Sequence, residues 1–279
     1  MNICGSSVLI TGAASGIGRA TAFAFAARRP AAIVACDIDE AGLKETVAGL
    51  ESLGCEAVAM VMDVTDHYSV EQVVRAVIDR IGRLDIMVNA AGIGMMGRME
   101  CLTLEDWHRV IDINLWGTIN INRAVYPHML ERGTGHIVNI ASANGIYAPM
   151  PYIGPYATSK FGVVGLSEAL MVEGAPRGIR VTCVCPGNVK TPIYEKSVIR
   201  GFDEGARALT RLNTVIAEAP ERTAEKIARA VEKNRFIVVT TAVARASAFA
   251  RTHMQALWFA YTRVFTAVSE KMIRRYRSD

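Results

Sequence analysis

Tyr156 and Lys160 are the two residues whose types and spacing most directly suggest chemistry. In a helix, residues four apart lie on one face, one turn apart. A tyrosine has an ordinary pKa of about 10, and a unit charge about 4 Å away contributes about 4 kcal/mol at an effective dielectric near 20, or roughly 3 pKa units. Lys160 therefore has the right sign and size to make Tyr156 an acid–base catalyst. A packed ring beside a solvated amine is the alternative.

A glycine-rich turn near the N-terminus predicts a phosphate site. The apolar run at 7–11 reads as a buried strand, and the helix expected after the turn ends at Pro30. A glycine turn between a strand and a helix places backbone N–H groups against a phosphate. Similar turns also occur without a ligand. The position of this turn after the first strand is what favours a phosphate site. The turn residues are Gly12, Ser15, Gly16, Ile17 and Gly18.

Asp37 follows the second expected strand, 31–36, and lies 25 residues after Gly12. A carboxylate at this spacing accepts hydrogen bonds from an adenosine ribose. It would repel a 2′-phosphate by about 1–4 kcal/mol at about 4 Å. We therefore predict NAD as the cofactor and disfavour NADP. Asp39 is a competing candidate, and Asp37 has the alternative role of capping the turn.

Strands alternate with helices through the rest of the first 240 residues. The later helices are expected at 41–50, 69–81, 104–132, 156–174 and 223–232, and the later strands at 57–62, 85–88, 136–140, 178–184 and 236–239. This order predicts an α/β fold of Rossmann type, a doubly wound parallel sheet with helices on both faces. Such sheets bind ligands at the carboxyl ends of their strands. Asp37, Asp63, Asn89, Ser142 and Pro186-Gly187 all fall at strand ends.

Composition narrows the class of protein. The chain has 279 residues, 51% of them hydrophobic, and a net charge of +4, which is too small to indicate a nucleic-acid surface. The six cysteines are scattered without metal-ligand spacing, so we expect free thiols, no metal site and a reducing, cytoplasmic setting. We see no signal-peptide pattern and no apolar run of the roughly 18 residues that a membrane span needs.

With these motifs together, residues 5–240 resemble the short-chain dehydrogenase/reductase family. Its cofactor motif T-G-x-x-x-G-x-G matches Thr11, Gly12, Gly16 and Gly18. Its N-N-A-G motif matches 89–92, with Ala90 in place of the second asparagine. Its catalytic Asn-Ser-Tyr-Lys set matches Asn114, Ser142, Tyr156 and Lys160. The interval from Ser142 to Tyr156 is about one residue longer than is usual in the family.

The resemblance implies hydride transfer between a nicotinamide and a secondary alcohol or ketone. Tyr156 would exchange the hydroxyl proton, Ser142 would hold the substrate oxygen, Lys160 would bond the nicotinamide ribose, and Asn114 would position a water. Asp63 would contact the adenine. The alternative is that it caps a helix through Thr65. The family also implies cofactor contacts at Val64, Asn89, Ala90, Gly92, Pro186, Gly187, Val189 and Thr191.

The substrate loop is expected over about 192–220. Mostly apolar candidates for the pocket wall suggest a bulky apolar alcohol or ketone of steroid, retinoid, terpenoid or fatty-alcohol type. Tyr152 lacks a lysine four residues later, so it is rejected as the catalyst. The wall candidates are Ile93, Met95, Met96, Tyr147, Met150, Tyr152, Ile193 and Tyr194.

A basic tail, 241–279, follows the expected domain at 1–240. It holds seven Lys and Arg against two acidic residues. An apolar stripe at helical spacing predicts either packing over the pocket or a partner subunit, or peripheral contact with an anionic membrane. Trp258, Phe259 and Ile273 widen the stripe. Its members are Leu257, Tyr261, Val264, Phe265, Val268 and Met272.

The sequence thus predicts an NAD-dependent alcohol dehydrogenase, and by analogy with the family a homodimer or homotetramer formed through the helices at 104–132 and 156–174. The alternatives are an NADPH-dependent ketone reductase and a non-catalytic nucleotide-sensing or scaffold protein of the same fold. The presence of all four residue types of the catalytic set argues against the scaffold.

Overall fold

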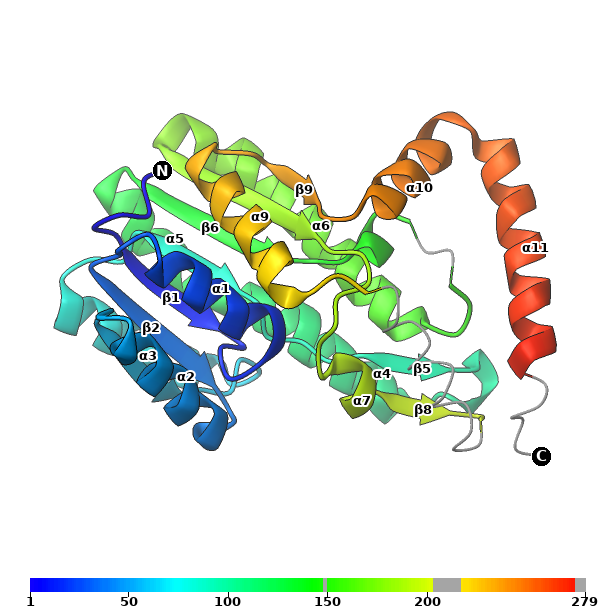
Figure 1. Ribbon diagram of the computed structural model, residues 1–279, viewed down its shortest axis with the longest axis horizontal. Coiled ribbons are helices and arrows are strands. Elements are labelled where there is room, and N and C mark those ends of the chain that lie inside the picture. The colour runs from blue at the N-terminus through cyan, green and yellow to red at the C-terminus, as the bar shows by residue number, and fades with distance from the viewer. Residues whose placement is uncertain (148–149, 203–216, 274–279) are drawn as a thin grey trace.

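A computed structural model describes residues 1–147, 150–202 and 217–273. Its central sheet has seven parallel strands in the order β3-β2-β1-β4-β6-β7-β9 (Figure 1). The chain runs outward from β1 to β3 and then crosses to β4, on the other side of β1. This reversal is the point where such sheets form ligand crevices. The strands are β1 (Ser7–Thr11), β2 (Ala32–Asp37), β3 (Ala57–Val61), β4 (Ile86–Asn89), β6 (Gly135–Ile140), β7 (Ile179–Cys185) and β9 (Ile237–Val239).

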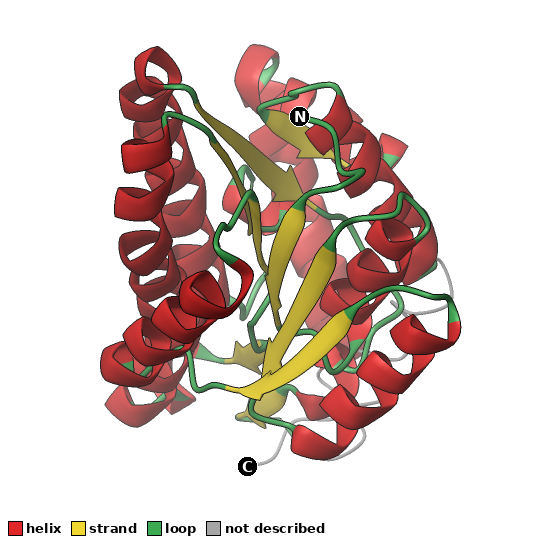
Figure 2. Ribbon diagram, turned by 90° about the vertical axis from the view of Figure 1, so that its left-hand side faces the viewer, coloured by secondary structure: helices red, strands yellow, loops and turns green. Residues whose placement is uncertain are grey.

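Helices cover both faces of the sheet, as Figure 2 shows. Successive side chains of a strand point to opposite faces, so Val8 and Ile10 of β1 lie in one hydrophobic core and Leu9 lies in the other. The predicted doubly wound α/β fold is confirmed. The first core is covered by α1 (Gly16–Ala26), α2 (Glu40–Ser52) and α9 (Pro220–Glu232), and the second by α3 (His67–Ile81), α5 (Gly117–Arg132) and α6 (Gly154–Gly174).

The expected helix over 104–132 is interrupted, so that prediction is wrong in its continuity. α4 (Leu104–Ile111) and α5 are joined by a π-helical turn, Asp112–Trp116, which contains Asn114. A π turn inserts one residue into the helical register and often marks a functional site. The insertion changes which side chains of this helix face the sheet.

A small second sheet joins the loop after β4 to the segment after β7, and the sequence did not predict it. β5 (Met95–Gly97) pairs in parallel with β8 (Val198–Arg200), which follows the short helix α7 (Ile193–Lys196). Asp106 of α4 accepts a hydrogen bond from Arg200 at 2.9 Å. Of these elements, α7 and β8 form the first part of the expected substrate loop, and 203–216 lie outside the described residues.

The tail forms two helices, α10 (Ala242–His253) and α11 (Gln255–Ile273), and α11 stands apart from the sheet (Figure 1). Within the described chain, no helix has the length and apolar character to cross a membrane. Trp258 is buried, unlike the four stripe residues whose exposure is described. These are Leu257, Tyr261, Val264 and Val268, whereas the side chains of Phe265 and Met272 lie outside the described part.

Candidate active site

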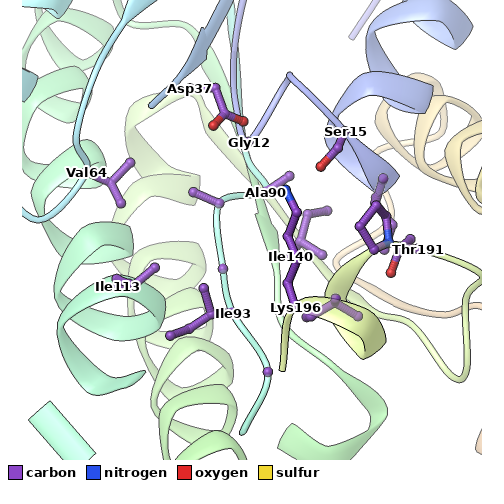
Figure 3. A pocket seen from close by; sticks show the side chains of 18 of the residues that line it. Gly12, Ser15, Asp37, Val64, Ala90, Ile93, Ile113, Ile140, Thr191 and Lys196 are labelled. Atoms are coloured by element: carbon purple, nitrogen blue, oxygen red, sulfur yellow. The ribbon is translucent and has the colours of Figure 1, made fainter. Parts of the chain in front are cut away.

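A cavity of about 440 Å³ lies at the carboxyl ends of the central strands (Figure 3). It extends from the glycine turn after β1 to the segment after β7, and its volume is typical of small-molecule sites. Most of the predicted site residues line this cavity. They are Gly12, Ser15, Gly16, Ile17, Gly18, Asp37, Asp63, Val64, Ala90, Gly92, Ile93, Ser142, Tyr156, Lys160, Pro186, Gly187, Val189, Thr191, Ile193 and Tyr194.

The glycine turn is built for close backbone contact. Gly12 has a φ of +66°, and a Cβ there would lie 2.7 Å from the backbone of Ala90. A Cβ on Gly18 would lie 2.1 Å from the carbonyl oxygen of Gly12. Ser15 makes no capping hydrogen bond with its side chain, and its hydroxyl points toward the cavity (Figure 3). The N-terminus of α1 therefore faces the cavity with the geometry of an anion site.

Asp37 and Asp39 have different roles in the structure. Asp39 is the N-cap of α2, where its carboxylate accepts from the Gly42 N–H at 3.1 Å. Asp37 accepts from the N–H groups of Ala14 and Asp39, each at 3.1 Å, and lines the cavity. These two bonds cap the turn, as the alternative expected, and they also fix the carboxylate at the cavity edge.

Asp63 lines the cavity next to the buried side chain of Val64. Its carboxylate accepts from the backbone N–H and the hydroxyl of Thr65, both at 2.8 Å. This is the expected alternative contact, although the N-cap of α3 is Asp66. Asp63 thus closes a turn and still presents acceptor oxygens at the cavity.

Thr11 holds the loop that follows β4. Its hydroxyl donates to the Asn89 side-chain oxygen at 2.9 Å and accepts from the N–H groups of Ala90 and Ala91, each at 3.2 Å. Ala90 makes its contact with Thr11 through its backbone N–H. The alanine that replaces the second asparagine of the family motif therefore does not remove this bond, and the loop stays anchored. Asn89 itself is buried behind the cavity wall rather than lining the cavity.

Asn114 also lies behind the wall. Its side-chain oxygen accepts from the Ile93 N–H at 2.8 Å, and its side-chain nitrogen donates to the Ile93 carbonyl at 3.0 Å and to the Ser159 hydroxyl at 3.1 Å. These bonds join the π turn to the loop after β4 and to α6. In this structure Asn114 therefore fixes backbone, and its predicted role in positioning a water stays a prediction.

Ser142, Tyr156 and Lys160 come together in the cavity. The Lys160 ammonium donates to the Ile140 carbonyl at 3.0 Å and lies 5.9 Å from the centre of the Tyr156 ring. Burial lowers the pKa of Lys160 to about 8.

The expected lowering of the Tyr156 pKa by Lys160 is not what this structure shows. Burial raises the pKa of Tyr156 above its ordinary value, and the hydrogen bond with Ser142 only partly opposes that effect. Burial of the phenol is therefore the dominant effect on its pKa in this structure. In the described chain, Ser142 rather than Lys160 is the group that favours the Tyr156 phenolate.

The wall candidates divide into two groups. Ile193 and Tyr194 of α7 and Ile93 opposite them line the cavity, and burial raises the pKa of Tyr194 to about 12. The remaining candidates lie outside this cavity, among other side chains. Met95 and Met96 belong to β5, Tyr147 packs on Trp258, Met150 is half-buried, and Tyr152 packs on Phe202 with 5.1 Å between ring centres.

The sequence reasoning missed several residues that line the cavity, and Ile113 and Lys196 are the two that most affect its chemistry. Ile113 of the π turn reaches the cavity because of the register change, which the helical period did not predict. Lys196, the last residue of α7, lies across the cavity from Ile93 and Ile113 (Figure 3). It brings a positive charge to a cavity lined also by Asp37, Asp39 and Asp63, and no motif in the sequence signalled it.

Comparison with known proteins gives consistent matches. The family model for short-chain dehydrogenases matches residues 6–200. The 3-oxoacyl-acyl-carrier-protein reductase FabG of Thermotoga maritima is 39% identical over 229 residues, which cover 81% of this chain and 90% of that protein. EphD of Mycobacterium tuberculosis is also 39% identical, but the match covers only 40% of its length.

Solved structures show the same relationship. A short-chain dehydrogenase/reductase from Burkholderia phymatum in complex with NAD has a TM-score of 0.84 at 27% identity, and the match covers 92% of this chain and 96% of that one. An actinorhodin polyketide ketoreductase with NADPH has a TM-score of 0.75 at 32% identity, over 84% of this chain and 95% of that one.

The predicted resemblance is thereby confirmed, and the comparisons favour an enzyme over the non-catalytic alternative. With this fold and cavity, the chain belongs to the short-chain dehydrogenase/reductase family and is an oxidoreductase with a nicotinamide cofactor.

Proposed function

We propose that this protein is an NAD-dependent dehydrogenase of secondary alcohols, acting on a bulky apolar substrate. The cofactor preference rests on Asp37, whose carboxylate is fixed at the cavity edge by the N–H groups of Ala14 and Asp39. A 2′-phosphate placed beside this carboxylate would meet a like charge. NADPH-dependent ketone reduction is the second candidate, supported by the NADPH complex of the related ketoreductase.

The cavity fits a dinucleotide at three points. The turn at Gly12 and Gly18 leaves no room for side chains, so backbone closely approaches the cavity there. The N-terminus of α1 suits a pyrophosphate, and Asp37 suits a ribose with two free hydroxyls. When bound, a nicotinamide supplies the hydride acceptor for alcohol oxidation.

The chemistry of the chain's own residues follows from their positions. In oxidation, the Tyr156 phenolate takes the substrate hydroxyl proton. In reduction, the Tyr156 phenol returns it. Ser142 donates a hydrogen bond to the substrate oxygen where charge develops. Lys160 is held by the Ile140 carbonyl beside the Tyr156 ring, where its ammonium would bond the nicotinamide ribose.

The substrate preference rests on the apolar side chains at the cavity. Ile93, Ile113 and Ile193 line it, and Tyr194 adds a half-buried ring. Lys196, the last residue of α7, is the feature that least fits a purely apolar substrate. Turnover confined to small polar polyols would contradict this part of the proposal.

The test follows absorbance at 340 nm with purified protein, NAD or NADP, and a panel of secondary alcohols and ketones that includes steroids, retinol and a 3-oxoacyl thioester. Wild type and Tyr156→Phe are measured side by side. Turnover with NAD that disappears in Tyr156→Phe supports the proposed reaction and its proton carrier. A faster reaction with NADPH and ketones would favour the second candidate.

An even-numbered homo-oligomer is proposed from exposed apolar side chains on the helices that the family uses for assembly. Leu104, Trp116, Phe161 and Val172 lie on α4, the π turn and α6, and each is more than a third exposed. Light scattering coupled to gel filtration tests this, and a monomer across micromolar concentrations would refute it.

Peripheral membrane contact through α11 is a separate proposal. The exposed stripe residues supply apolar area, and residues 241–269 contain arginines but no acidic residue. Apolar area and positive charge together favour anionic lipid surfaces. Flotation with anionic liposomes, with and without residues 245–279, tests it. Equal recovery of both proteins in the lipid fraction would refute it.

A further inference from the structure

Trp258 connects the tail to the active-site end of the domain. It is 6% exposed, whereas its neighbours Leu257 and Phe259 are 58% and 60% exposed. The indole packs edge-on against the ring of Tyr147, with 5.5 Å between ring centres and 79° between ring planes. Such T-shaped pairs contribute beyond the area they bury. One side chain of α11 therefore docks on the domain while its neighbours remain exposed.

The other helix of the tail, α10, also contacts Tyr147. Tyr147 is 6% exposed and shares a hydrophobic cluster with Ala244 of α10 and Trp258 of α11. Burial raises the pKa of Tyr147, and a side-chain hydrogen bond with Ser247 of α10 opposes this effect. Both helices of the tail thus contact one ring.

Tyr147 ends the hydrogen-bonded turn that begins at Ser142. The Ala143 N–H donates to the Pro186 carbonyl at 2.7 Å, and the Tyr147 N–H donates to the Ala143 carbonyl at 3.0 Å. The Ser142 hydroxyl oxygen accepts from the Asn144 N–H at 3.1 Å. A movement of Tyr147 would therefore be transmitted through hydrogen-bonded backbone to the serine.

The turn also touches the backbone of the catalytic helix. A Cβ added to Gly145 would lie 2.5 Å from the Lys160 carbonyl oxygen, so the two segments are in direct contact there. The spacing of Ser142 from Tyr156 and Lys160 depends on this contact. A displaced turn would change the position of Ser142 relative to the phenol.

We propose that Trp258 is a positioning residue: with Tyr147 it forms a latch through which the C-terminal tail fixes the turn bearing Ser142. The inference rests on the proposed function, because its consequence for rate requires the reaction at Ser142 and Tyr156. The latch residue lies outside 6–200, the stretch matched by the family model. The tail is thus part of the active-site structure of this chain.

The test compares Trp258→Ala with Phe259→Ala, the adjacent exposed aromatic residue. Misplacement of about 1 Å costs catalysis up to about 100-fold, so Trp258→Ala is expected to lower kcat by about 10- to 100-fold. The Kd of NADH, measured by fluorescence, should change much less than kcat, because the latch packs on the turn that bears Ser142 and not on the glycine turn after β1. Phe259→Ala should stay within about twofold of wild type. Trp258→Phe should recover most of the lost kcat.

Hydrogen exchange makes the latch testable independently of turnover. The amides of 143–147 should exchange faster in Trp258→Ala than in wild type or Phe259→Ala. Unchanged exchange, or unchanged kcat, overturns the latch, and so does a kcat loss matched by an equal loss of NADH binding. A wild type without turnover on the whole panel refutes the proposed function instead, and the exchange measurement still decides the contact.

Discussion

The side chain of Asn114 pairs with both backbone polar groups of Ile93, accepting from its N–H at 2.8 Å and donating to its carbonyl at 3.0 Å. This reciprocal pair ties the π turn to the loop after β4. Asn114 is fully buried, so water cannot replace either bond. The cavity wall formed by Ile93 and Ile113 depends on that one amide.

Asn114→Ala is expected to weaken both stability and activity. The change leaves two backbone groups of Ile93 unpaired, and each buried unpaired group costs about 1–3 kcal/mol. Urea unfolding at pH 7 should therefore show a loss of about 2 kcal/mol or more, together with lower kcat/KM. Asn120→Ala is the matched control. It removes a half-buried bond to the Val64 carbonyl and should cost less than half as much.

The sequence predicted the sheet well because long apolar strands and their polar ends carry a local signal. It could not predict the π turn, because asparagine in mid-helix is locally unfavourable but the register change requires the tertiary bonds to Ile93. The strands β5 and β8 have three residues each. Segments that short show no reliable period, and the equally short β9 was predicted because it follows the expected helix at 223–232 in the alternating order.

The helical period of the apolar residues also could not predict which of Trp258 and Phe259 is buried. Both widen the apolar surface of α11, and only the contact with Tyr147 determines which is buried. The catalytic pair shows a related limit. The spacing predicted that Tyr156 and Lys160 lie in one cavity. It could not predict the Tyr156 pKa, which depends on the burial of the phenol and on where the Ile140 carbonyl holds the Lys160 ammonium.

Asp37→Ser is expected to relax cofactor selectivity. Removing the carboxylate removes a repulsion of about 1–4 kcal/mol toward a 2′-phosphate, which corresponds to roughly 5-fold or more in the ratio of kcat/KM for NAD and NADP. The control is Asp66→Ala, which removes the N-cap of α3 outside the cavity and costs about 1 kcal/mol of stability. Selectivity should not change in that control. An unchanged ratio in Asp37→Ser would refute the assignment of Asp37 as the residue that selects NAD over NADP.

Tyr156→Phe is expected to lower kcat by about 100- to 10,000-fold, the usual contribution of a general acid–base group. The substitution removes only the hydroxyl, so NADH binding should be retained. The control is Tyr194→Phe, since that hydroxyl contacts Asn188 at 3.4 Å and should matter less. Retained turnover in Tyr156→Phe would reassign the proton carrier.

The pH dependence of oxidation should follow the Tyr156 phenol. Burial raises its pKa, so alcohol oxidation should accelerate as pH rises, and ketone reduction should slow over the same range. The pKa of Lys160 is about 8, so Lys160 is neutral in the more alkaline range where the Tyr156 phenol ionises. Lys160→Gln should therefore leave the rising limb in place. A limb that moves to higher pH in this variant would show that the charge of Lys160 favours the phenolate.

We predict that the protein loses stability in acid because His136 is buried. The imidazole is fully buried in β6, and its Nε2 lies 2.8 Å from the Thr182 hydroxyl. That hydroxyl donates its one proton to the Arg235 carbonyl at 2.8 Å, so Nε2 must carry the ring proton and donate it. Nδ1 is left bare, without a hydrogen-bond partner in the described chain. Burial lowers the pKa of His136 from 6.5 to about 3.

The sign of the effect follows from proton binding. Between pH 6.5 and about 3 the unfolded chain binds a proton at His136 that the folded chain does not, so stability falls as pH falls through this window. One such proton lowers the free energy of unfolding by about 2 kcal/mol between pH 7 and pH 5. Urea unfolding at both values, at fixed protein concentration, measures the difference for wild type. His136→Gln should show a difference smaller by about that amount, whereas the exposed control His67→Gln should match wild type. A His136→Gln variant with the full wild-type dependence would show that other groups cause the acid sensitivity.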